Sequence, residues 1–299
     1  TRTGLRPCTI RMSARVQRIE RAIKMDIKSG STIVVWFSCG AASAIAAQET
    51  IRQYPDCKIR IVNNPVEEEH EDNRRILKDV EKWLEKEVEV ATNSKYPSAS
   101  AKDVWEKRKY MAGVSGAPCT IELKKEARKE WERYNHADYH VLGFTKDEKG
   151  RYDRFTLTER DNVIPVLIDA GLDKQDCYDR LHDAGIEPPL MYALGFPNAN
   201  CIGCVKSNSP TYWNHVRKHF PEVFRERAEQ SRRIGAKLVR VKGERYFLDE
   251  LDPETMGAPL KSMKVECGIF CEEGDDEQEE PEGHQKSLFP EIAVRGKNG

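Results

Sequence analysis

The chain has 299 residues, of which 38% are hydrophobic and 33% charged, and its formal net charge is −1. This length suits one large or two modest domains, and the balanced charge gives no global signature of a polyanion-binding protein. No apolar run approaches the roughly 18 residues that span a bilayer, and the basic N-terminus lacks the apolar core of a signal peptide. We therefore expect a cytoplasmic protein with no membrane partner.

The first 29 residues are rich in arginine and lysine. Val16, Ile19, Ile23 and Ile27 recur at helical spacing, which predicts a basic amphipathic helix. We expect this N-terminal helix to pack on the domain that follows. A nucleic-acid contact is the alternative.

Residues 33–44 carry the strongest local signal. A buried-strand run ends on Ser38-Cys39-Gly40 and passes into an Ala-rich helix that contains Ser43. Small residues let the backbone approach an anion, and a helix N-terminus offers free N–H groups and the positive end of a dipole. The segment therefore predicts a phosphate-holding loop around Ser38, Gly40 and Ser43. It is neither a Walker A loop nor a dinucleotide fingerprint, and an ordinary strand-to-helix turn is the alternative.

Strand and helix patterns then alternate. The predicted strands cover residues 32–38, 58–64, 88–92 and 139–144. The predicted helices cover residues 41–54, 68–87, 101–110 and 121–134. This alternation predicts an α/β fold with a doubly wound parallel sheet and a ligand at the carboxyl ends of the strands. A different region is expected from residue 164 onward, with a short helix over 174–184.

Nine cysteines is a high number for a reducing compartment, where disulfides are rare. Clustered cysteines there indicate metal or redox chemistry. Cys201 and Cys204 form one close pair, Cys267 and Cys271 another, and Cys119 stands in a Gly-Ala-Pro-Cys-Thr turn. Two close pairs would also suit a structural zinc site, although their separation exceeds that of a zinc ribbon.

The loop Ser38-Cys39-Gly40-Ala41-Ala42-Ser43 resembles the PP-loop of the adenine nucleotide alpha-hydrolase superfamily, Ser-Gly-Gly-x-Asp-Ser, with Cys39 and Ala42 as departures. Within that superfamily the chain resembles the phosphoadenosine and adenosine phosphosulfate reductases, closest to the reductase-like proteins often found in phages and mobile elements. The resemblance covers roughly residues 31–271. Its segments are the loop, Cys119 with Lys124 and Lys125, the Cys201–Cys204 pair, and Glu266-Cys267-Gly268-Ile269.

The resemblance implies a four-iron four-sulfur cluster. Cys119, Cys201 and Cys204 match its cysteine positions, Thr120 replaces one ligand, and Cys271 is our expected fourth ligand, with Cys267 the alternative. It also implies that the Cys267 thiolate attacks the sulfur of a nucleotide-bound sulfate. Phe270 stands where the reductases have a histidine.

The resemblance also implies the remaining site residues. Lys124 matches a catalytic lysine, Asn63 ends the strand that contacts adenine, and Gly143, Arg151 and Arg154 lie where the reductases carry an arginine-bearing loop. Positive charge in such a loop would neutralise an anionic substrate. A turn-forming role for Asn63 and a solvated charged loop are the alternatives.

These observations predict an oxidoreductase of sulfur metabolism that acts on an adenylyl sulfate, with a nucleotide substrate and an electron or sulfur donor protein as partners. One alternative is an ATP-dependent sulfurtransferase that thiolates a nucleic-acid base. The other is a non-enzymatic nucleotide-binding or zinc-stabilised module. The predicted parts are the N-terminal helix over 1–29, a PP-loop domain over 30–195, a Cys-rich cluster-binding region and C-terminal arm over 196–271, and an acidic disordered tail over 272–299.

Overall fold

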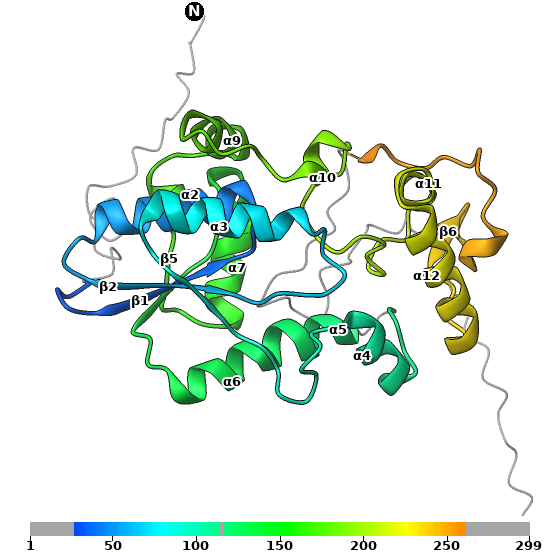
Figure 1. Cartoon of the computed structure of the whole chain (residues 1–299), viewed down its shortest axis with the longest axis horizontal. Coiled ribbons are helices and arrows are strands. Elements are labelled where there is room, and N and C mark those ends of the chain that lie inside the picture. Colours follow the sequence, from blue (N-terminus) through cyan, green and yellow to red (C-terminus); the bar gives the residue numbers. More distant parts are fainter. Residues whose placement is uncertain (1–26, 114–115, 261–299) are drawn as a thin grey trace, which may run out of the picture.

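The computed structural model describes residues 27–113 and 116–260. At its centre is a five-stranded, all-parallel sheet with the strand order β3-β2-β1-β4-β5 (Figure 1). The strands are β1 (Thr32–Phe37), β2 (Lys58–Asn63), β3 (Val88–Val90), β4 (Tyr139–Val141) and β5 (Val163–Ile164). The chain winds outward from β1 to β3 and then crosses to β4 on the other side of β1. The prediction of an α/β fold with a parallel sheet is confirmed, and the winding reverses between β1 and β4.

Helices cover both faces of this sheet, with α2, α3 and α9 above it and α6 below it in Figure 1. The upper layer is α2 (Ala41–Gln53), α3 (Asp72–Leu84), α8 (Val166–Asp169) and α9 (Lys174–Asp183). The lower layer includes α6 (Ala127–Tyr134) and α7 (Lys149–Thr158), the latter preceded by η2 (Lys146–Glu148). Because β1 is buried on both faces, its sequence is a continuous apolar run rather than an alternating one.

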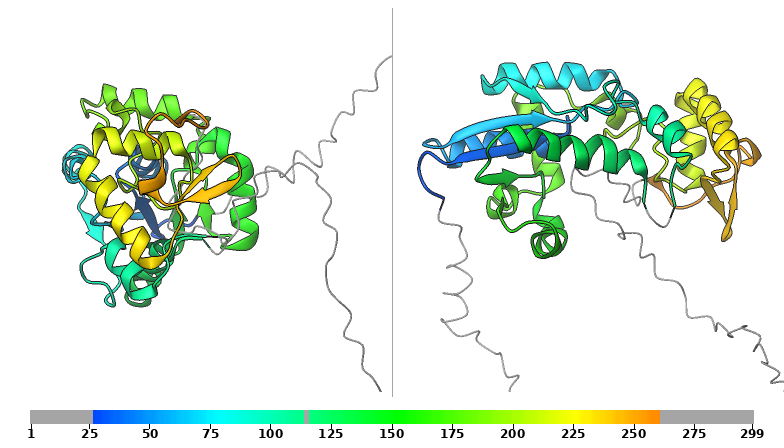
Figure 2. Two further views of the ribbon diagram at one scale, coloured as in Figure 1. Left: turned by 90° about the vertical axis from the view of Figure 1, so that its right-hand side faces the viewer. Right: turned by 90° about the horizontal axis from the view of Figure 1, so that it is seen from below.

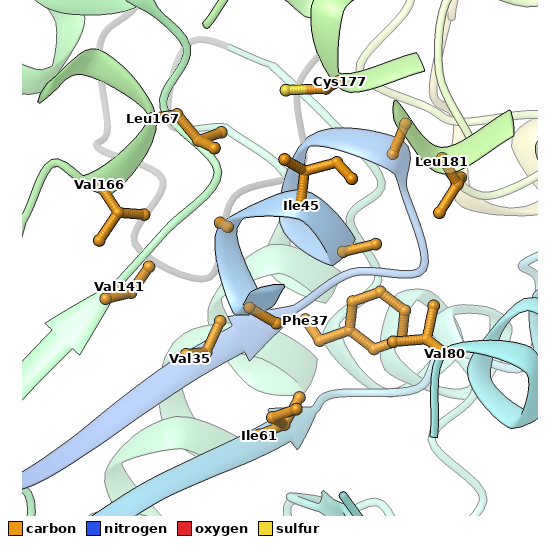
Figure 3. Packing of buried hydrophobic residues seen from close by; sticks show 14 of the residues in the cluster. Val35, Phe37, Ile45, Ile61, Val80, Val141, Val166, Leu167, Cys177 and Leu181 are labelled. Atoms are coloured by element: carbon orange, nitrogen blue, oxygen red, sulfur yellow. The ribbon is translucent and has the colours of Figure 1, made fainter. Parts of the chain in front are cut away.

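The upper core packs the small residues of α2 against the sheet. Figure 3 shows Ile45 of α2 above Val35 and Phe37 of β1, with Leu181 of α9 beyond it. The lower face carries a second apolar layer in which Trp36 meets Trp131 of α6 edge to face. Alanines let α2 approach the sheet closely, which fixes the position of its N-terminus.

A second core lies at the end of the molecule toward which the strands point (Figures 1 and 2). From the C-terminal half it includes α10 (Leu190–Ala193), α11 (Pro210–His219), α12 (Pro221–Ile234), β6 (Val239–Val241), β7 (Glu244–Tyr246) and η3 (Leu248–Glu250). From the N-terminal half it includes α4 (Ala101–Arg108), α5 (Pro118–Thr120) and the π-helix η1 (Ile121–Glu126). The Cys-rich segment is therefore packed against elements that precede β4.

Three sequence expectations differ from the structure. Residues 163–164 do not open a separate region, because β5 pairs with β4 in the same sheet. The helix expected over 68–87 begins only at Asp72, since the residues before it hold other elements in place. The helix expected over 121–134 is a π-helix followed by α6, which extends the short turn α5. Most of the predicted N-terminal helix and the whole acidic tail lie outside the described residues.

No helix in residues 27–113 and 116–260 has the length and apolar character needed to cross a bilayer.

Glu49 joins α2 to α9 through a buried carboxylate. It is 1% exposed and accepts hydrogen bonds from Arg52 (2.6 Å), Gln53 (2.9 Å) and Arg180 of α9 (2.7 Å). Burial alone would raise the pKa of Glu49, but these donors outweigh burial and lower it. The charged form therefore stabilises the fold.

We expect Glu49→Gln to lower the free energy of unfolding by about 1–3 kcal/mol at pH 7, because a hydrogen bond to a charged group is lost inside the protein. Since the folded pKa is lowered, this stabilisation is present at neutral pH and disappears as the pH falls below the ordinary glutamate pKa of about 4.3. Urea unfolding at pH 7 and at acid pH measures both effects. Glu67→Gln, at an exposed glutamate 4.0 Å from Arg74, is the matched control. If Glu49→Gln lowered the free energy of unfolding by the same amount at acid pH as at pH 7, this account would be contradicted.

Candidate functional site

The loop between β1 and α2 forms the floor of the candidate site. Cys39 has a left-handed backbone (φ 57°), and Gly40 is the N-cap of α2 in an extended conformation. The Ser43 hydroxyl donates to the Gly40 carbonyl (2.9 Å) and accepts from the Ser38 N–H (3.2 Å). These bonds hold the loop closed on the first turn of α2. Because Gly40 has no side chain, the end of the helix has no cap of its own.

Gly143 brings the end of β4 onto the same turn. A Cβ atom built on Gly143 would lie 3.0 Å from the Ser43 nitrogen and 3.1 Å from the Ala42 carbonyl carbon. A side chain at this position has no room, so the close approach of the two segments requires glycine. The β1 loop and the β4 loop thus meet where the winding of the sheet reverses. This is the position at which open α/β sheets bind ligands.

Cys39 is a buried, protonated thiol. It is 2% exposed, and burial raises its pKa to about 12, with Glu69 raising it further and Lys124 opposing. The Asn63 side chain donates to the Phe37 carbonyl (2.8 Å) and lies 3.6 Å from the Cys39 sulfur. Asn63 therefore braces the loop, and Cys39 is a structural residue rather than a reactive thiolate.

Tyr192 is the residue at this site that the sequence patterns did not reveal. Its hydroxyl lies 3.5 Å from the Cβ position of Gly40 and faces the Ala41 N–H, which partly offsets the effect of burial on its pKa. Burial raises the pKa of Tyr192 to about 12, so the phenol stays neutral. A phenol oxygen thus takes the position that a phosphate oxygen would occupy at the start of α2. No local motif marks this residue, because α10 reaches the loop only through the tertiary fold.

Lys124 lies next to this floor and is also buried. Its ammonium donates to the Asn64 carbonyl (2.6 Å) and to Glu69 (3.0 Å), and its side chain is 8% exposed. Lys124 stands in the π-helix η1, and π-turns are frequent at functional sites. The positive charge of Lys124 opposes the rise in the pKa of Cys39, so Lys124 is close enough to the loop to act on it electrostatically. The predicted catalytic lysine is therefore brought to the predicted nucleotide loop.

The segment after β2 and the first turn of α3 connect the region of the β1–α2 loop to the cysteine-bearing loop through hydrogen bonds. The Asn73 side chain donates to Glu69 (3.2 Å) and to the Ala199 carbonyl (3.3 Å), and the Ile202 N–H donates to the Glu68 carbonyl (2.9 Å). The cysteine loop is thereby fixed beside the partner of Lys124.

Cys119, Cys201 and Cys204 all belong to the second core. Cys119 and Cys201 are half-buried against it, and Cys204 is 8% exposed. The Tyr212 hydroxyl accepts from the Cys204 N–H (2.8 Å) and donates to the Cys201 carbonyl (3.4 Å), which holds the two ends of the pair together. Gly203, with φ 68°, makes the turn between them.

Among the described ranges, no three histidine, cysteine, aspartate or glutamate side chains are arranged as a metal-ligand group. The expected fourth ligand Cys271 and the expected nucleophile Cys267 lie outside these ranges. His215 and His219, four residues apart on α11, have a packing role, since the His215 ring contacts Phe196 and its Nε2 meets the Leu194 carbonyl (2.7 Å).

The arginines expected in the β4 loop are further from the floor. Arg151 pairs with Glu148 (2.9 Å) and lies over the Phe144 ring, 5.2 Å from its centre. Arg154 is exposed on α7.

Comparison with protein-family models finds no match to this chain, and a search of curated proteins finds no similar sequence. The functional argument therefore depends on the motifs and on this geometry.

We expect Gly143→Ala to lower the free energy of unfolding by about 1–3 kcal/mol, because its Cβ would press on backbone atoms of α2 that cannot rotate away. Gly40→Ala is the matched control, since the nearest atom to its Cβ is the Tyr192 hydroxyl at 3.5 Å, an ordinary contact. Urea unfolding of both variants measures the difference. Equal stabilities would show that the two loops do not meet as closely as described.

Proposed function

We propose that this chain is a PP-loop enzyme that binds an adenine nucleotide on the β1–α2 loop and acts on an adenylyl sulfate, as phosphoadenosine and adenosine phosphosulfate reductases do. The observation that carries the proposal is the junction of Gly40 and Gly143 at the reversal of the sheet. There the 13-residue helix α2 begins beside two glycines, and its N-cap residue Gly40 offers no side chain to its free N–H groups. Such a junction suits the phosphates of a nucleotide.

A second observation supports binding of the adenine end. The Asn64 carboxamide is 3% exposed, and its Nδ2 donates to the Ala91 carbonyl (2.9 Å). Its Oδ1 is buried without a donor among the described residues. An unsatisfied buried acceptor is costly, and the amino group of adenine is a donor that would satisfy it. Asn64 follows β2, which ends beside the phosphate loop.

Lys124 would supply positive charge for the sulfate or phosphate group. Its present partner is the Glu69 carboxylate, so an anionic substrate would compete with Glu69 for the same ammonium. The buried position strengthens either interaction relative to water.

The cysteine donors suit the implied iron–sulfur cluster in chemistry. Cys119, Cys201 and Cys204 are soft sulfur ligands on one apolar core, and Cys271 would complete the set. In this proposal the cluster supplies electrostatic and redox tuning when bound. Zinc is the alternative occupant.

Cys267 would perform the covalent step. Its thiolate forms an S–S bond with the sulfate sulfur as the S–O bond to the nucleotide phosphate breaks, and the nucleotide leaves with that electron pair. A dithiol donor protein then releases sulfite from the enzyme-bound thiosulfonate and is itself oxidised to a disulfide.

We expect isothermal titration to show binding of ATP, AMP or an adenylyl sulfate by the full chain. Gly40→Val should weaken binding at least tenfold by blocking the approach of phosphate, while its extended backbone (φ −99°, ψ 159°) accepts valine without strain. Tyr192→Phe should tighten binding about 2- to 10-fold, because the hydroxyl that faces the Ala41 N–H and would compete with a phosphate oxygen is removed. Tyr178→Phe, on the neighbouring ring, is the control. A folded protein that binds none of these nucleotides would refute the proposal.

We expect anaerobically purified protein to contain iron and acid-labile sulfide and to absorb visible light. Cys119→Ser, Cys201→Ser and Cys204→Ser should each lose most of the iron, because a serine oxygen is a poor ligand for this site. Cys57→Ser, at the start of β2 and outside the second core, should retain it.

Cys267→Ser distinguishes the nucleophile from a ligand. It should keep the visible absorbance and lose sulfite release. Colourless protein that holds one zinc would exclude the iron–sulfur cluster, and sulfite release by Cys267→Ser would exclude direct attack by this residue.

A further inference from the structure

The β6–β7 hairpin carries a concentration of exposed positive charge. Its basic side chains, and the one just before it, are Lys237, Arg240, Lys242 and Arg245. Among the described residues none of these four has a carboxylate partner. The Arg240 and Arg245 side chains instead donate to carbonyls, of Gly243 (3.1 Å) and Lys237 (3.4 Å). The whole chain is nearly neutral, so this charge is local.

The hairpin has a fixed shape. Lys242 and Gly243 both have positive φ (50° and 89°), as the tight two-residue turn of a twisted hairpin requires. Arg240 and Arg245 therefore lie on paired strands, and Lys242 lies in the tight turn that joins them.

A groove of about 360 Å³ lies between this hairpin and the end of α4. Its lining includes Lys109 and Tyr110 on one side and Lys237 and Arg245 on the other. The one nearby carboxylate of α4, Glu106, is engaged by Arg233 (2.7 Å), which also fixes α4 to α12. Both views in Figure 2 show α12 and the hairpin at the same end of the molecule.

The groove borders the second core. Ala112 in its lining packs on the second core, as Cys119 and Cys201 do. Gly113 pairs with Gly116, and the chain then enters α5, which carries Cys119. A ligand along this groove would lie near the start of the cysteine region.

We propose that this groove binds the phosphodiester backbone of a single-stranded nucleic acid. The exposed cations extend along the hairpin beyond the groove, which exceeds what one phosphate group needs and matches a repeating polyanion. Tyr110 is 36% exposed at the groove and offers a ring on which a base can stack. Stacking on a side chain requires a base that is not already stacked in a duplex, which favours a single strand.

Fluorescence anisotropy with labelled dT20 and rU20 tests this proposal on the full chain, without any added nucleotide, so its result is independent of the adenine site. We expect binding that weakens steeply with salt. The triple variant Lys237→Glu, Lys242→Glu, Arg245→Glu should lose more than tenfold in affinity and reduce the salt slope by about 2–3. Tyr110→Leu should lose about 5- to 100-fold.

The matched control is Lys78→Glu, Lys82→Glu, Lys86→Glu, which changes the charge equally at exposed lysines on and just after α3. It should bind as the unmodified chain does. Equal losses in both triple variants, tighter binding of a duplex, or no salt-dependent binding would overturn the proposal. A last outcome is that the oligonucleotides bind only to a full-length variant whose acidic side chains in residues 272–280 have been neutralised. The acidic segment would then be the occupant of the groove, and the proposal would be overturned.

Discussion

Two adjacent carboxylates after β2 hold both halves of the candidate site. Glu68 accepts from the Ser100 hydroxyl (2.8 Å) and the Ala101 N–H (2.7 Å) and so caps α4, while Glu69 pairs with Lys124. The Glu69–Lys124 pair is buried, and removing one partner of such a pair leaves an uncompensated charge that is expensive to bury. The same segment holds the cysteine loop through Ile202. The phosphate loop and the cysteines are therefore positioned by one short stretch of chain.

Local patterns were sufficient for the sheet and for the strand–loop–helix unit at its start but not for the residues around that unit. The apolar run of β1 and the small residues after it predicted the strand–loop–helix unit, because both signals are local. The helix expected from residue 68 fails since Glu68 and Glu69 bond to distant elements rather than to their own helix. Strand β5 has two residues, too few for a period to be read. Tyr192 reaches the loop through tertiary packing, which no spacing in the sequence encodes.

The loop itself explains one departure from the motif it resembles. The first glycine of that motif is Cys39 here, and Cys39 adopts the left-handed backbone that glycine adopts without cost. An ordinary side chain in this conformation costs about 1 kcal/mol or more. Burial of the thiol and the contact with Asn63 offset that cost. The substitution keeps the shape of the loop and adds an apolar contact beneath it.

The short helix α10 gives the two halves of the molecule a thermodynamic connection. In the proposed enzyme, a phosphate bound to the Ala41 N–H would displace the Tyr192 hydroxyl that faces it, and the helix that carries Tyr192 has only four residues. Directly after that helix, the Leu194 carbonyl is held by His215 of α11, in the core that carries the cysteines. A displacement of Tyr192 would therefore also affect the contact between Leu194 and His215 just after α10. In the proposed enzyme, a group bound by the cysteines would therefore change nucleotide affinity by the same factor by which the nucleotide changes the affinity for that group.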